Sequence, residues 1–335
     1  MAPRPEHRIE VLDSFRALAI LPVIAFHYSL TYVPAAPGRP TAFVPNDGPF
    51  ALGWLGVELF FMISGFVIFL TLHNCRSIWE FGVRRGLRLY PTLIVCALAT
   101  FLLAPRIDPG WPAIAPSSLG ASLLLLPPLG HTLWVDQAYW SLQVEVVFYV
   151  WIGVLFFAAR DRFLIAWLAL IAGSTLATVL APHSPAILAL GSPYLPFFTF
   201  GMASYLRYSQ GRMTRPAALL LAAAAASYVV LWQARGLGVH LLIAAMILLF
   251  EAFLRGGLKW LRIAPLSWLG RISYPLYLLH DVLGLALTAR LDAARILSLG
   301  VVVLVMIGLA AAIHLGVERP THRIARAWAR GPACA

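Results

Sequence analysis

Ten runs of mainly apolar residues, each about as long as a membrane-crossing helix, constrain this chain more than any other feature of its sequence. A helix needs about 20 apolar residues to cross the hydrocarbon core of a bilayer. The runs are 14–32, 51–72, 89–104, 139–158, 163–181, 187–206, 216–234, 238–254, 272–290 and 296–317. The sequence therefore predicts an all-α, polytopic transmembrane helical bundle of about ten spans.

The composition excludes the usual classes of soluble protein. Hydrophobic residues make up 61% of the 335 residues and charged residues only 12%, whereas soluble proteins carry about 25% charged residues. A soluble chain must cover its surface with polar groups, so a soluble enzyme, a disordered protein and a nucleic-acid-binding module are all excluded. The three cysteines show no paired or ligand spacing, which predicts neither a disulfide framework nor a metal site.

The basic residues predict the orientation of the spans. Of the 25 lysines and arginines, 19 fall on one side of the ten runs, five on the other, and Arg16 inside the first run. Cytoplasmic loops carry the excess of positive charge, so both termini are predicted to be cytoplasmic. We read residues 1–317 as the transmembrane domain and 318–335 as a basic cytoplasmic tail whose helical pattern lies on anionic lipid headgroups. Asp13 and Arg16 interrupt the start of the first run, which favours a retained span over a cleaved signal peptide.

Three titratable residues lie in one predicted layer near the outer surface. His27, Glu58 and Glu145 each stand about five or six residues below the outer end of their runs. Ionisable side chains are costly inside a membrane and are therefore candidate functional groups. An imidazole with a carboxylate partner is suited to general-base catalysis. The alternative is that each carboxylate is a buried hydrogen-bond anchor between helices and that the histidine only packs in the bundle.

A second layer, of arginines, lies toward the cytoplasmic side. Arg16 precedes His27 by eleven residues, which is about 16 Å along a helix. Arg85 and Arg88 are three residues apart and share a helix face, and guanidinium groups match phosphate oxygens. We predict that these arginines bind a phosphate group. The alternative is membrane anchoring by positive charge, which we prefer for Arg84 and leave open for Arg16.

Five blocks of sequence, in order, resemble the acyltransferase-3 family of integral membrane acyltransferases. Together they cover the chain from residue 11 to about 285. The blocks are Val11-Leu-Asp-Ser-Phe-Arg16 with ten residues before His27, Gly56-Val-Glu-Leu-Phe-Phe-Met-Ile-Ser-Gly65-Phe, Arg85-Gly-Leu-Arg88-Leu-Tyr-Pro91, Trp140-Ser-Leu-Gln-Val-Glu145-Val-Val-Phe-Tyr149 and Ile272-Ser-Tyr-Pro-Leu-Tyr-Leu-Leu-His280.

The resemblance implies a multi-pass enzyme of the bacterial cytoplasmic (inner) membrane that transfers an acyl group, usually acetyl from acetyl-CoA, to a hydroxyl of a glycan, lipid-linked sugar or glycoside. The donor is then a substrate and no cofactor is bound permanently. The implied partners are acyl-CoA, the glycan or glycoside acceptor and the lipid bilayer, without nucleic acid. Family precedent makes His27 essential and the arginines contacts of the donor. Glu58 departs from the pattern, since many members carry Asp there.

Together these features suggest a mechanism. The phosphates of cytoplasmic CoA bind Arg85, Arg88 and Arg16, and the pantetheine arm carries the thioester outward to His27. His27 then either deprotonates the acceptor hydroxyl or is transiently acylated, and both routes stay open. Glu145 orients the imidazole or stabilises its charged form.

Other residues of the family blocks are expected to support the site. Asp13 belongs to the first block. Ser64 stands next to Gly65, where small residues let two helices approach closely, and it lacks the strand-turn-helix context of a serine nucleophile. Tyr277 and His280 are expected to pack and hydrogen-bond in the middle of a span.

The rival function is a secondary transporter or flippase of a small anionic or sugar-linked substrate. Such proteins also use buried Arg, His and Glu, but they show internal symmetry and broken helices in matching positions. The charged blocks here are concentrated in the first 150 residues, which favours the enzyme.

Overall fold

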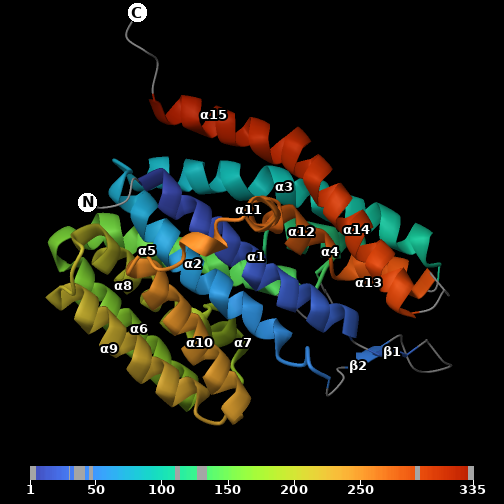
Figure 1. The fold of residues 1–335 in the computed structure, drawn as a ribbon. Helices are drawn as coiled ribbons and strands as arrows, with labels where there is room; N and C mark the ends of the chain where they lie inside the picture. Colours follow the sequence, from blue (N-terminus) through green and yellow to red (C-terminus); the bar gives the residue numbers. More distant parts are fainter. Residues whose placement is uncertain are drawn as a thin grey trace, which may run out of the picture. The chain divides into compact units, whose positions relative to one another are not determined.

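The computed structural model describes residues 5–29, 31–33, 42–44, 48–109, 114–126, 134–290 and 295–330, and these residues are mostly helical (Figure 1). The predicted all-α class is confirmed. A short antiparallel hairpin of β1 (Thr31–Val33) and β2 (Ala42–Val44) is the exception among the described residues, with Thr31 paired to Val44.

Fifteen α-helices follow one another along the described residues. They are α1 (Pro5–Ser29), α2 (Gly56–His73), α3 (Ile78–Ile107), α4 (Pro116–Leu123), α5 (Tyr139–Ala159), α6 (Phe163–Leu180), α7 (Pro185–Ala189), α8 (Leu195–Gln210), α9 (Arg215–Trp232), α10 (Leu237–Leu254), α11 (Ala264–Arg271), α12 (Ser273–Leu279), α13 (Val282–Arg290), α14 (Arg295–Ile313) and α15 (Arg319–Arg330). Single 3₁₀ turns lie at Gly53–Leu55, Arg160–Arg162, Ser192–Tyr194 and Lys259–Leu261, and a π-helical turn at His314–Glu318 joins α14 to α15.

Seven stretches of the described residues are long and apolar enough to cross a membrane, so the chain is a multi-pass membrane protein. They are Glu10–Ser29, Gly53–His73, Ile78–Ile107, Tyr139–Leu180, Arg215–Trp232, Leu237–Leu254 and Leu299–Ala325. Tyr139–Leu180 contains both α5 and α6, so eight of the ten predicted runs largely overlap these stretches. The runs 187–206 and 272–290 do not, because each is divided between shorter helices. The number of spans and the side of the termini stay predictions.

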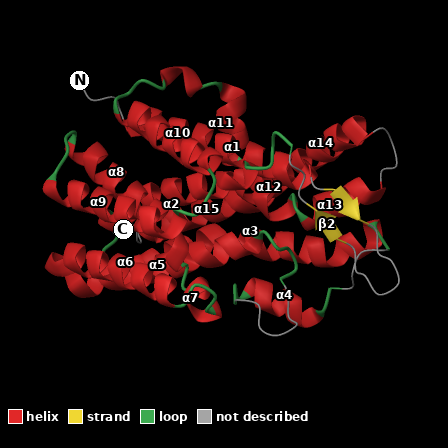
Figure 2. Ribbon diagram, turned by 90° about the horizontal axis from the view of Figure 1, so that it is seen from below, coloured by secondary structure: helices red, strands yellow, loops and turns green. Residues whose placement is uncertain are grey.

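The chain forms two compact units, which we describe separately. Unit 1 contains residues 1–19, 55–82 and 143–267, and unit 2 contains residues 20–54, 83–142 and 268–335. In unit 1, α8 contacts both α2 and α9, and α6 lies beside α9 (Figures 1 and 2). Thr175 of α6 and Ser227 of α9 share a hydrogen bond of 2.7 Å between their hydroxyls, which fixes the register of these two helices.

The crossing of α2 and α8 is the tightest helix contact of unit 1. A Cβ atom added to Gly65 would stand 2.1 Å from the carbonyl oxygen of Phe198, and one added to Gly201 would stand 2.1 Å from that of Met62. The two backbones therefore touch directly, which small residues permit. The close helix contact predicted at Gly65 is confirmed.

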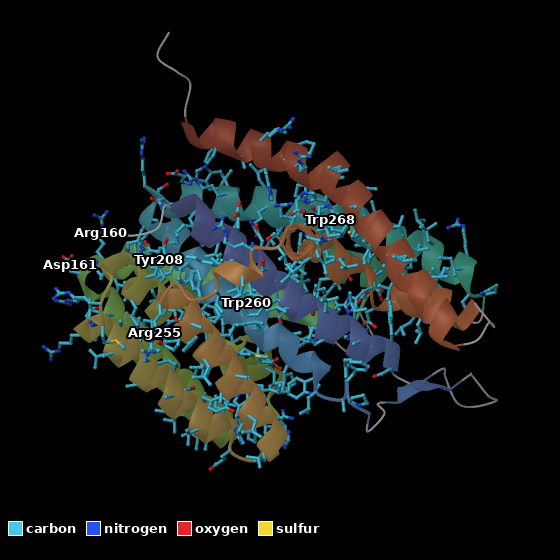
Figure 3. All side chains as sticks on the ribbon, in the orientation of Figure 1. Arg160, Asp161, Tyr208, Arg255, Trp260 and Trp268 are labelled. Carbon is cyan, nitrogen blue, oxygen red and sulfur yellow. The ribbon has the colours of Figure 1, made fainter. Side chains whose placement is uncertain are left out.

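Four charged residues of unit 1 stand at or near the ends of its helices. Arg160 and Asp161 occupy the turn between α5 and α6, at the edge of the helices (Figure 3). Arg207 near the end of α8 forms a two-bond ion pair with Glu251 near the end of α10, in which one N–O distance is 2.9 Å. This pair joins the last turns of two helices that are distant in sequence.

Candidate functional site

His27 lies in the last turn of α1, within unit 2, and its ring faces a second histidine. Its Nδ1 stands 2.9 Å from the carbonyl oxygen of Val23, one turn earlier, and 3.2 Å from Nε2 of His280. The two ring centroids are 4.8 Å apart and the rings are nearly perpendicular. His27 is half-buried and His280 is fully buried. The histidine predicted to be catalytic is thus held on its Nδ1 edge.

His280 occupies a break in the backbone, so the run 272–290 is not one continuous helix. Helix α12 ends at Leu279 and α13 begins at Val282. In a continuous helix, the amide of Val282 would donate to the carbonyl of Leu278. Here that amide donates to Oδ2 of Asp136 at 3.1 Å, and the Leu278 carbonyl accepts from the Tyr139 hydroxyl at 3.3 Å. The donor of the helical bond is taken by Asp136, just before α5, and the acceptor by Tyr139, the first residue of α5, so the helix is interrupted.

Asp136 is the buried group on which this break depends. Its side chain is fully buried, and Oδ1 accepts from the amide of Ala138 at 2.9 Å while Oδ2 holds Val282. Its carboxyl also interacts with that of Asp281. Burial, and then the neighbouring Asp281 carboxyl, raise the pKa of Asp136 well above its usual range. Two carboxyls in contact do not both ionise readily, so the neighbouring Asp281 adds to the effect of burial on Asp136.

A second set of hydrogen bonds ties α12 to the start of α5. The Tyr277 hydroxyl donates to the carbonyl of Ala138 at 3.0 Å and lies 2.7 Å from the Ser141 hydroxyl. The Tyr277 ring also lies against His280, with centroids 5.3 Å apart. Tyr277 and His280 therefore do pack and hydrogen-bond as expected, but at a helix break and not in the middle of a helix.

The three arginines predicted to bind phosphate belong to different units. Arg85 and Arg88 are both on α3 in unit 2, where Arg85 is only 8% exposed and Arg88 is half-buried. Arg16 is on the part of α1 that belongs to unit 1, and its guanidinium forms a 2.6 Å ion pair with Asp13. Asp13 therefore supports Arg16 directly. That the three arginines bind one donor stays a prediction.

Glu145 and Ser64 are hydrogen-bonded to each other within unit 1. The Ser64 hydroxyl of α2 and the Tyr149 hydroxyl of α5 both donate to Oε1 of Glu145, each at 2.6 Å. Glu145 thus links α2 to α5, as the anchor interpretation expects. Its predicted action on His27 stays untested.

Unlike Glu145, Glu58 has no described hydrogen bond to its carboxylate. The side chain is 1% exposed, and neither carboxylate oxygen has a hydrogen-bond partner among the described residues. The structure therefore gives no hydrogen bond that would make Glu58 an anchor between helices.

Sequence reasoning missed Asp136, Tyr139 and Tyr149. An acidic residue just before an apolar helix is a capping signal, and Asp136 does accept the amide two residues later. Its second partner, Val282, is 146 residues away. No local pattern points to such a contact.

Comparisons with known proteins identify the family of the chain. A family model described as "Acyltransferase domain" matches residues 9–315, which include every candidate residue above. An O-acetyl transferase of Shigella phage Sf6 is 29% identical over 98 residues, covering 29% of this chain and 27% of that protein. The acyltransferase MdmB of Streptomyces mycarofaciens is 29% identical over 150 residues, covering 43% of this chain and 38% of that protein.

The chain thus spans about a quarter to two fifths of the curated relatives that it matches. No solved structure matches it significantly. The family match extends over most of the chain, from before the Arg16 block to beyond the His280 block. The chain therefore belongs to the acyltransferase-3 family.

Proposed function

We propose that the protein is a membrane O-acyltransferase that moves an acetyl group from cytoplasmic acetyl-CoA to a hydroxyl of an exported glycan, lipid-linked sugar or glycoside, in the cytoplasmic membrane of a bacterium. The observation that carries this proposal is the arrangement of His27. The ring is half-buried, and both of its described hydrogen-bond contacts, to Val23 and to His280, are made by its Nδ1 edge. Its other nitrogen is thereby left for a reacting group.

The comparisons support the chemistry. One relative is named an O-acetyl transferase and another an acyltransferase, and both names describe transfer of an acyl group. A reaction of this kind forms an ester bond at the acceptor oxygen and breaks the thioester of the donor. The hydroxyl proton must pass to the leaving thiolate, and an imidazole performs this transfer as base and then as acid. The alternative route, through a transient acyl-imidazole on His27, fits the same position.

The donor end of the proposal depends on Arg85 and Arg88. An arginine that only anchors a helix at the membrane surface extends its guanidinium into water. Arg85 is buried and Arg88 is half-buried, so both are held in place by the protein. Their fixed donors suit the phosphates of CoA.

The experiment measures donor binding and transfer separately in purified protein reconstituted in nanodiscs. Labelled acetyl-CoA should bind the wild type, and R85Q and R88Q should each weaken binding about tenfold or more, as expected for loss of a charged hydrogen bond. R76Q, which changes an exposed arginine before α3, is the matched control and should bind normally.

H27A should bind acetyl-CoA normally but transfer no label to the glycan or glycolipid fraction of membranes. Transfer by H27A at the wild-type rate would remove His27 from the mechanism. Absence of acetyl-CoA binding by the wild type would refute the proposed donor. The transport alternative also uses interrupted helices, so the break between α12 and α13 does not separate the two functions, whereas release of CoA does.

A further inference from the structure

We propose that His280 is a positioning residue that selects the reacting nitrogen of His27. Nε2 of His280 accepts a hydrogen bond from the protonated Nδ1 of His27, which leaves Nε2 of His27 as the base or nucleophile. This inference rests on the proposed acyltransferase function, because it concerns the same imidazole. It is carried by the hydrogen bonds of the two rings, all within unit 2.

The protonation of His280 follows from its own backbone contact. Its Nδ1 lies 2.7 Å from the carbonyl oxygen of Tyr277. A carbonyl only accepts hydrogen bonds, so Nδ1 of His280 carries a proton. The side chain is 0% exposed, and burying an imidazolium in such a place is costly. The neutral ring therefore has its lone pair on Nε2.

The same argument then fixes His27. Its Nδ1 faces two acceptors, the carbonyl oxygen of Val23 at 2.9 Å and Nε2 of His280 at 3.2 Å. Nδ1 of His27 must therefore carry the proton and share it between the two. In the neutral ring the lone pair is then on Nε2, which has no partner from these contacts. The carbonyl of Val23 belongs to the same helix and holds only the ring edge, whereas His280 reaches the ring from a distant part of the chain.

The arrangement also stabilises the charged form of His27. When Nε2 takes the proton of the acceptor hydroxyl, the positive charge spreads to Nδ1 and strengthens its hydrogen bond to His280. The proton on Nε2 is then given to the CoA thiolate, which leaves as the thiol, and the acetyl group ends on the acceptor oxygen. His280 thus has the orienting role that a carboxylate has in Ser-His-Asp triads, but without a net charge.

The break between α12 and α13 keeps His280 in this position. Asp136 and Tyr139 hold the two free ends of the interrupted helix, and the Tyr277 ring packs on the imidazole. A fully buried side chain fixed from both sides has little freedom to rotate. The structure therefore supplies both the hydrogen-bond acceptor and the rigidity that a positioning residue needs.

The first test does not depend on activity. Nitrogen NMR of histidine-labelled protein distinguishes the two neutral tautomers of an imidazole, and the H27A spectrum assigns the His27 signals by difference. We expect His27 to be protonated on Nδ1 and unprotonated on Nε2 in the absence of substrate. In H280L this preference should weaken, because the Val23 carbonyl is then the remaining acceptor of the two that face Nδ1. A wild-type His27 protonated on Nε2 overturns the inference, even if the enzyme transfers acetyl groups.

The second test asks whether an acceptor at residue 280 is what matters. Glutamine places its amide oxygen near the position of Nε2, whereas leucine fills the space without an acceptor. H280L should lower kcat about 100-fold, within the range for general-base catalysis and for residues that orient a catalytic group, with KM for acetyl-CoA within about twofold of wild type. H280Q should recover most of the loss.

The outcomes separate the two proposals. If H280L and the wild type have equal kcat, the positioning role is wrong while the acyltransferase function stands. If the wild type transfers nothing to any acceptor, the function fails, and the NMR result still decides which nitrogen of His27 is protonated. If H280L does not fold, two measurements still decide: the NMR experiment on the wild type and the comparison of the wild type with H280Q. H280Q should then keep most of the wild-type kcat and keep His27 protonated on Nδ1.

Discussion

Replacing Gly65 with alanine should separate α2 from α8, because the added methyl group has no space at their crossing. Its Cβ would stand 2.1 Å from the carbonyl oxygen of Phe198 and within 2.9 Å of two more backbone atoms. An ordinary contact needs about 3.4 Å, so the helices must move apart locally by about 1.3 Å. Side chains can rotate away from such a clash, but a helix backbone cannot.

The magnitude follows from two opposing effects. Overpacking a well-filled core costs about 1–3 kcal/mol, and a clash of a side chain with backbone belongs at the upper end, about 3 kcal/mol. Replacing a helical glycine by alanine returns about 0.5–1 kcal/mol. The expected net loss in free energy of unfolding is about 2 kcal/mol, roughly a thirtyfold change in the unfolding equilibrium.

The assay is unfolding of the protein in mixed micelles by increasing denaturing detergent, followed by tryptophan fluorescence. G173A on α6 is the matched control, because none of the described residues lies within 4 Å of its added Cβ and the change should stabilise the protein slightly. If G65A unfolds at the same detergent fraction as the wild type, the backbone contact between α2 and α8 does not exist as described.

Three further changes test separate parts of the structure. D281N should reduce the pH dependence of the melting temperature. The raised pKa of Asp136 means that the folded state binds more protons than the unfolded state above pH ~4, so wild-type stability falls as the pH rises. The substitution removes the second cause of that raised pKa, the Asp281 carboxyl, and an unchanged slope contradicts this. E145Q should lower the unfolding free energy by about 2 kcal/mol in the same detergent titration, because two hydroxyl donors lose a charged acceptor at about 1 kcal/mol each; a wild-type transition would show that the charge is not used. R207Q should cost about 1–2 kcal/mol, since it leaves Glu251 without its partner, and the double variant with E251Q should regain part of that loss in a double-mutant cycle; additive losses would refute the pairing.

The sequence was sufficient for the fold class and for the approximate position of most long helices. Long apolar runs are local features, and they determine the class because a membrane-spanning backbone must satisfy its own hydrogen bonds. The run 272–290 differs most from what the sequence suggests, because it is not one continuous helix. Its composition is that of a span, but the bonds that interrupt it come from Asp136 and Tyr139, far away in sequence. Hydropathy contains no information about such contacts.

In the candidate site too, local sequence features identified residues, whereas contacts between distant parts of the chain could not be predicted. His27 was identified because an imidazole inside an apolar run is unusual, and Arg85 and Arg88 because of their helical spacing. Ser64 was expected to pack, whereas in the structure it also donates to Glu145. His280 was expected to hydrogen-bond, but its partner was not predictable, since 253 residues separate it from His27.

The interruption at residues 280 and 281 makes residues 136–139, which lead into α5, part of the framework of the site. Asp136 and Tyr139 occupy a donor and an acceptor that would otherwise bond to each other. If that segment withdrew, the amide of Val282 and the carbonyl of Leu278 would be free to close the missing helical turn. The imidazole of His280 would then turn with the straightened helix and leave its neighbour, so the two buried residues Asp136 and Tyr139 control whether the rings of His280 and His27 meet.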